Sequence, residues 1–75
     1  MTLDQAILEH WMAGDQVAGV GFSLSEPVVI TAGPLVGTLG AIVALVALFP
    51  DPLYTVEIGG GRGDVHVLQA DLTAA

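Results

Sequence analysis

The 75-residue sequence predicts a mainly β domain, with one N-terminal α-helix followed by a small barrel of about five strands. Three observations support this prediction. Apolar residues recur at helical spacing only near the N-terminus, short β-branched runs alternate with glycine and proline over the remainder, and the length suits one hydrophobic core. We therefore expect a single domain over residues 1–75, with the helix in residues 1–14 and the barrel in residues 15–75.

The N-terminal helix is predicted over residues 3–13. Thr2 and Gln5 have the spacing of a capping box, and Gly14 is typical of a helix end. Asp4 would lie in the first turn, where the helix dipole favours a negative charge. A helix this short is unstable alone, so its apolar stripe must pack against another surface. The stripe consists of Leu3, Ile7, Leu8, Trp11 and Met12.

The strands are predicted from alternation and from the breaks between them. Residues 15–24 would form a glycine-loosened strand, because every second residue from Ala18 to Leu24 is apolar. Further strands are expected at residues 28–31, 41–48, 53–58 and 64–69. A glycine-rich hairpin turn at residues 59–63 joins the last two, and one helical turn is expected at residues 70–72.

The uncharged stretch at residues 28–49 admits a second interpretation, a membrane-spanning helix. Gly33 and Pro34 interrupt it, and residues 35–49 as a helix would rise only ~22 Å, against a hydrocarbon thickness of ~30 Å. No lysine or arginine flanks the stretch to set an orientation. The patterned hairpin after it also needs a sheet to join. We therefore expect two strands of a barrel here and no membrane span.

The order of strand and glycine signals in the middle of the chain resembles a known family. A β-branched strand at residues 28–31 precedes Gly33-Pro34, Gly37, Gly40 and a strand that contains Ile42-Val43. This order resembles the KOW motif of SH3-like β-barrels, and the following strands and turns extend the resemblance to about residue 72. The resemblance implies a small SH3-like β-barrel of about five strands.

The sequence departs from this family in two ways. KOW proteins that bind RNA or ribosomes resemble one another in their basic loops, whereas Arg62 is the only base here. In addition, the strand that closes an SH3-like barrel would follow Leu72, where only three residues remain. We therefore expect residues 17–24, or a second chain, to fill the gap at the edge of the barrel.

The charge excludes several classes of partner. The net charge is −7, and there is no lysine or cysteine. Nucleic acid and anionic membrane surfaces attract basic proteins, so neither is expected as a partner. The N-terminus lacks the basic region and apolar run of a secretory signal, so a cytoplasmic location is expected.

No residues in the sequence form a catalytic, cofactor-binding or metal-binding motif, so the chain is not expected to be an enzyme. His66 with Asp64, and Glu9 with His10, are too few to predict a metal site, which usually needs three or four ligands. The glycine-rich residues 59–63 lack the helix and lysine of a phosphate-binding loop.

These observations favour a non-enzymatic protein-interaction module that assembles as a homo-oligomer. The hydrophobic content is 53%, more than a 75-residue core can bury, so part of it should face a partner chain. One alternative is a KOW-like accessory that contacts the transcription or translation machinery through protein. Another is a binder of small ligands at a subunit interface near Trp11, Tyr54 and His66. The predicted interface residues are Leu3, Ile7, Trp11, Met12, Leu45, Leu48 and Phe49.

Overall fold

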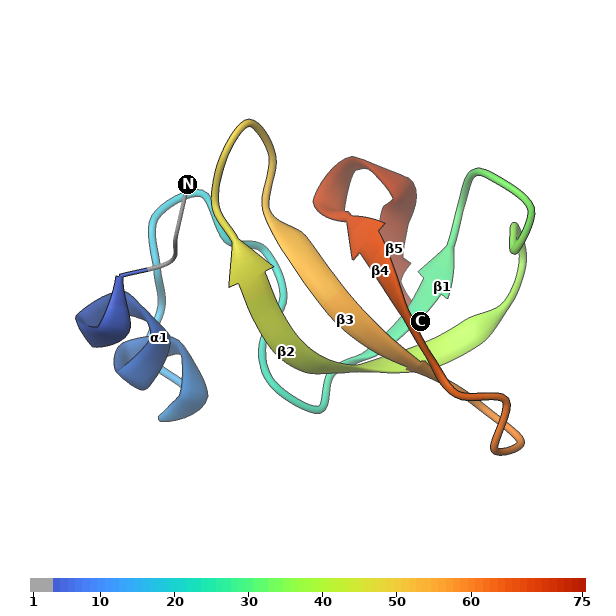
Figure 1. The fold of residues 1–75 in the computed structure, drawn as a ribbon, viewed down its shortest axis with the longest axis horizontal. Helices are drawn as coiled ribbons and strands as arrows, with labels where there is room; N and C mark the ends of the chain where they lie inside the picture. Colours follow the sequence, from blue (N-terminus) through green and yellow to red (C-terminus); the bar gives the residue numbers. More distant parts are fainter. Residues whose placement is uncertain (1–3) are drawn as a thin grey trace.

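The computed structural model describes residues 4–75, which form one N-terminal helix and one five-stranded antiparallel sheet (Figure 1). The sheet has the strand order β4-β3-β2-β1-β5, so β2 lies at its centre and β4 and β5 lie at its edges. No ladder joins β4 to β5 in the described part of the chain. The elements are α1 (Gln5–Met12), β1 (Pro27–Ile30), β2 (Leu39–Ala47), β3 (Leu53–Ile58), β4 (Asp64–Leu68), the 3₁₀ turn η1 (Gln69–Asp71) and β5 (Leu72–Ala74).

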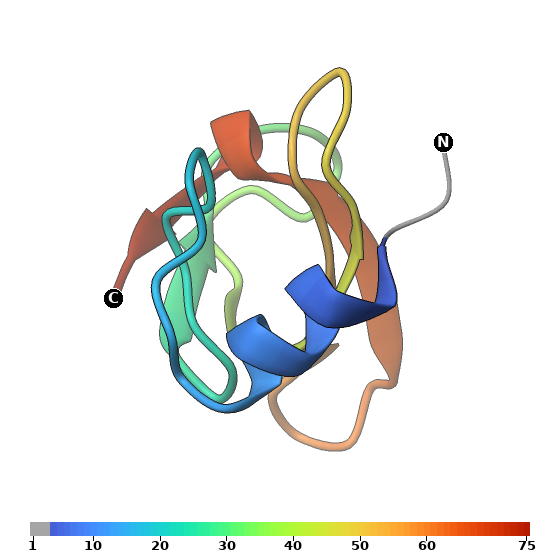
Figure 2. The same cartoon turned by 90° about the vertical axis from the view of Figure 1, so that its left-hand side faces the viewer.

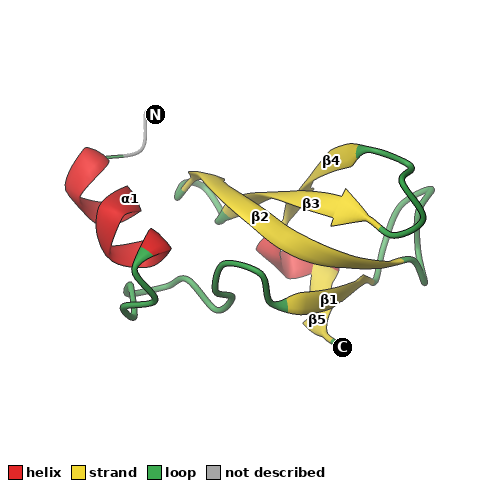
Figure 3. Cartoon of the chain, turned by 90° about the horizontal axis from the view of Figure 1, so that it is seen from below, coloured by secondary structure: helices red, strands yellow, loops and turns green. Residues whose placement is uncertain are grey.

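The sheet curls around its core, and α1 lies across one end of it (Figures 2 and 3). Inward-facing side chains from all five strands meet those of α1 and of the loop that follows it. Two irregularities in the register between β2 and β3 allow the long central strand to bend, as β-bulges do. The buried residues are Trp11, Val20, Val28, Ile30, Ile42, Leu45, Tyr54, Val56, Ile58, Val67 and Leu72.

The helix is capped differently from the sequence prediction. Asp4 is the N-cap residue, and its Oδ1 accepts a hydrogen bond of 2.8 Å from the backbone N–H of Ala6. This satisfies one of the backbone donors that every helix leaves free at its start. The predicted capping residue Thr2 lies outside the described residues. The helix ends at Met12, Ala13 is its C-cap residue, and Gly14 follows with a φ of 88°.

Residues 15–24 do not form the predicted strand. They are a loop with turns, and no strand pairs with them in the described chain. Gly19 has a φ of 80°, a left-handed conformation that breaks an extended chain. Backbone groups of this loop bond to side chains instead of to a neighbouring strand: Gly21 to Gln69, and Phe22 to Trp11.

The prediction that the chain lacks its own last edge strand is also wrong. The last residues form β5, which pairs with β1 through the partners Val28 and Ala74, Val29 and Thr73, and Ile30 and Leu72. The last residues of the chain, and not residues 17–24, therefore supply the strand beside β1. Because β4 and β5 do not pair within residues 4–75, the sheet is not closed into the predicted barrel. The one-turn helix was expected at residues 70–72 and is found at Gln69–Asp71.

The uncharged stretch at residues 28–49 forms most of β1, a loop and β2, as expected for two strands. No helix within residues 4–75 is long and apolar enough to cross a membrane.

Candidate interaction surfaces

Gln69 joins the loop after α1 to the sheet. Its Oε1 accepts hydrogen bonds from the Tyr54 hydroxyl at 2.6 Å and from the Gly21 N–H at 2.7 Å. Its Nε2 donates to the Gly19 carbonyl at 3.0 Å. One side chain therefore holds the two ends of the turn at residues 19–21 against β3. The sequence carried one signal for this role, because Gln69 shares the alternation of the inward-facing Val65 and Val67.

Tyr54 is completely buried beneath this junction. Burial raises the pKa of its hydroxyl above the ordinary value of 10.0, and the carboxylates of Asp51 and Glu26 act in the same direction. Backbone N–H groups near Phe22 and Gly21 oppose the rise in pKa. Its ring also meets that of Phe22 edge to face, with the centroids 5.7 Å apart. Tyr54 is therefore a neutral core residue that anchors the loop.

The predicted interface residues divide into three groups. Trp11 and Leu45 belong to the chain's own core, and Trp11 Nε1 donates a hydrogen bond of 2.8 Å to the Phe22 carbonyl. Ile7 and Leu48 are half-buried. Met12 and Phe49 are 56% and 64% exposed, so they remain accessible to a partner. Leu3 lies outside the described residues.

A row of exposed apolar side chains follows the central strand. We call it the β2 ridge, and it consists of Leu39, Val43 and Val46 of β2 with Phe49 just after the strand. Val43 and Val46 are more than one-third exposed, although they lie on the middle strand of the sheet. None of the four carries a charge, and apolar side chains exposed in a row indicate a contact surface.

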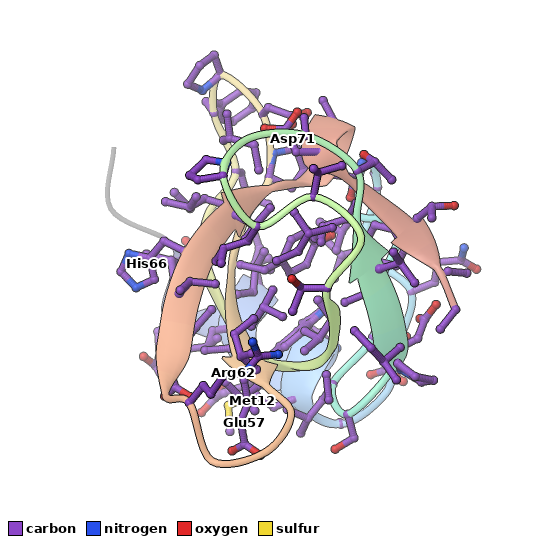
Figure 4. All side chains as sticks on the ribbon, turned by 90° about the vertical axis from the view of Figure 1, so that its right-hand side faces the viewer. Met12, Glu57, Arg62, His66 and Asp71 are labelled. Carbon is purple, nitrogen blue, oxygen red and sulfur yellow. The ribbon has the colours of Figure 1, made fainter. Side chains whose placement is uncertain are left out.

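A groove runs beside β4, on the side of the strand that faces the loop between β1 and β2. It has a volume of about 320 Å³. Figure 4 shows Asp71 beside that loop and His66 pointing outward from β4. The apolar part of its lining comes from Ile30, Ala32, Pro34, Leu35, Leu53, Val65, Val67 and Leu68.

The titratable side chains of the described residues lie mostly apart from one another. No three His, Asp or Glu side chains of residues 4–75 lie close enough to hold a metal ion. His10 Nδ1 lies 3.0 Å from Asp15 Oδ2, and both side chains are exposed. Trp11 and Tyr54 are buried whereas His66 is exposed, and Trp11 and His66 line separate hollows.

The surface thus offers an uncharged ridge over β2 and a groove of mixed polarity beside β4. Both are suited to contacts with other chains. Comparison of the sequence and structure with protein-family models, curated proteins and solved structures gives no match.

Proposed function

We propose that this chain is a non-enzymatic protein-interaction module, built on an SH3-like barrel, that associates with itself through the β2 ridge. The observation that carries the proposal is the row of uncharged, exposed apolar side chains on the central strand. Burying such side chains against a partner stabilises the complex by about 25 cal/mol for each Å² of apolar surface removed from water.

The strand order supports the SH3-like part of the proposal. The chain runs through β1, β2, β3 and β4 as a meander, makes the helical turn η1, and returns with β5 beside β1. This order agrees with the small barrels that residues 28–72 resemble in sequence.

A second copy of the chain suits the ridge because of charge. Two chains of net charge −7 repel one another, so they can associate only where carboxylates stay apart. None of the four ridge residues is charged, but the exposed Glu57 of β3 pairs with Ala41, between Leu39 and Val43. Two copies related by a two-fold axis would therefore meet along the part of the ridge from Val43 to Phe49, with Glu57 left at the rim in water.

Light scattering on a size-exclusion column, over a range of micromolar concentrations and without detergent, tests the proposal. We expect a dimer or larger assembly that dissociates on dilution, and that forms more readily as added salt screens the repulsion. A monomer at all concentrations and salt levels would overturn it.

A further inference from the structure

The outer edge of β4 presents backbone groups with no partner in the sheet. At the two ends of its ladder with β3, Ile58 donates to the Gly63 carbonyl at 2.9 Å and Gln69 donates to the Pro52 carbonyl at 2.7 Å. Hydrogen bonding alternates along an antiparallel pair, so Val65 and Val67 also direct their backbone groups at β3. The N–H and C=O groups of Asp64, His66 and Leu68 therefore point away from the sheet, where another strand could bond to them.

The groove lies along this edge. Its opposite wall, the first part of the loop between β1 and β2, is held by internal hydrogen bonds. Gly37 donates to the Ile30 carbonyl at 2.7 Å, and Val36 donates to the Gly33 carbonyl at 3.2 Å. Thr31 donates to the Asp71 carbonyl at 2.8 Å, which fixes the wall to η1. The groove is therefore a formed feature of the fold, with a hydrogen-bonding edge on one side and an apolar wall on the other.

The negative charge at the groove favours a positively charged partner. The Asp71 carboxylate, at one end of the lining, has no ion-pair partner among residues 4–75, and Asp64 lies on the same edge strand. A second copy of this chain would bring seven net negative charges and only one base. A partner rich in lysine or arginine would instead gain from both local and long-range attraction.

We propose that the groove binds an extended, basic segment of another protein, which pairs with β4 as an added strand. The partner's backbone bonds to His66 and Leu68, its alternate apolar side chains enter the groove, and a lysine or arginine reaches Asp71. Strand addition of this kind takes affinity from backbone bonds and specificity from the pockets beside them. The inference rests on the proposed role as an interaction module, but it uses a surface separate from the β2 ridge.

Titration with three end-capped nine-residue peptides, followed through the backbone amide resonances, tests the inference. The first alternates valine and lysine, the second alternates valine and glutamate, and the third repeats the first with every second backbone amide methylated. We expect the valine–lysine peptide to bind roughly tenfold or more tightly than the other two and to shift the amides of His66 and Leu68.

Two variants locate the binding. His66→Pro removes a free-edge donor that the ladder with β3 does not use, so the fold should persist while affinity falls roughly tenfold. His66→Ala keeps the donor and should bind as the wild type does. Asp71→Asn should weaken binding and reduce its dependence on salt. If His66→Pro does not fold, the affinities of the methylated peptide for the wild type and of the valine–lysine peptide for Asp71→Asn test the inference instead.

The outcomes separate this inference from the proposed function. No binding of the valine–lysine peptide, equal binding of its methylated form, or unchanged affinity in a folded His66→Pro variant would each overturn the inference. Self-association that persists alongside such a result would leave the proposed function standing. A monomeric chain that binds the peptide would overturn self-association and support strand addition.

Discussion

The Tyr54 hydroxyl donates a hydrogen bond of 2.6 Å to Oε1 of Gln69, from β3 to the turn that follows β4. The same oxygen accepts from the Gly21 N–H, so the bond links the core to the loop between α1 and β1. That loop contains no strand, and α1 is too short to be stable alone. The N-terminal part of the chain therefore depends on this junction and on the contacts of Trp11.

Replacing Gln69 with leucine should destabilise the fold by about 2 kcal/mol or more. The change leaves the buried Tyr54 hydroxyl without its partner, which costs about 1–3 kcal/mol. It also removes the bonds to the Gly21 N–H and the Gly19 carbonyl, which are exposed and can bond to water instead, so these add less. Urea unfolding measures the loss. Tyr54→Phe is the matched control, because it removes one bond and should cost about 1 kcal/mol. Equal losses in the two variants would contradict the role of Gln69.

Stability should fall at high pH because of Tyr54. Its pKa is raised in the folded protein, so above the ordinary value of 10.0 the unfolded chain loses this proton first and the free energy of unfolding decreases. The chain has one tyrosine, no lysine and no cysteine, so Tyr54 dominates titration in this range. Urea unfolding between pH 8 and pH 11 should show a decline that is absent from Tyr54→Phe. Tyrosinate absorbance should report the raised pKa, and a transition at or below the ordinary value would contradict it.

The strands were predictable where local signals agree. The bounds predicted for β3 match those of the structure, because alternation, a preceding proline and a following glycine all point to the same ends. Residues 15–24 alternate equally well, yet they form a loop. Their hydrogen-bonding partners include Gln69, which lies 48 residues from Gly21 along the chain. A hydrogen-bonding partner so distant in the sequence cannot be inferred from the alternation of residues 15–24.

The candidate surfaces were less predictable than the strands. Trp11 and Met12 are neighbours on the same predicted stripe, but Trp11 is 2% exposed and Met12 is 56% exposed. The difference depends on the direction from which α1 meets the sheet, which tertiary packing determines. The groove exists because one edge of β4 has no neighbouring strand. That edge is free because β5 pairs with β1 and not with β4. Three residues with one β-branched side chain are too weak a signal to predict it.

Replacing Gly40 with alanine should destabilise the fold by about 1–3 kcal/mol through overpacking. A Cβ at this position in β2 would lie 2.6 Å from Val56 Cγ1 and 2.7 Å from the Glu57 carbonyl oxygen. The carbonyl belongs to the adjacent strand β3, so it cannot move aside without disturbing the ladder. Urea unfolding of Gly59→Ala is the control, since its Cβ would meet only the Leu39 carbonyl oxygen at 3.8 Å. Equal stability of the two variants would contradict the prediction, because it would mean that β3 can move away from position 40 of β2 at little cost.

Replacing Val46 with glutamate should disrupt self-association without unfolding the chain. Val46 is 38% exposed, so a longer polar side chain has access to water in the monomer. In a dimer built on the β2 ridge the new carboxylate would be removed from water and placed near its copy, which should raise the dissociation constant roughly tenfold or more. Light scattering over a dilution series measures the change. Val36→Glu adds the same charge on a loop outside the ridge, so it should associate nearly as the wild type does. If both variants weaken association equally, general charge repulsion explains the effect and the ridge is not the interface.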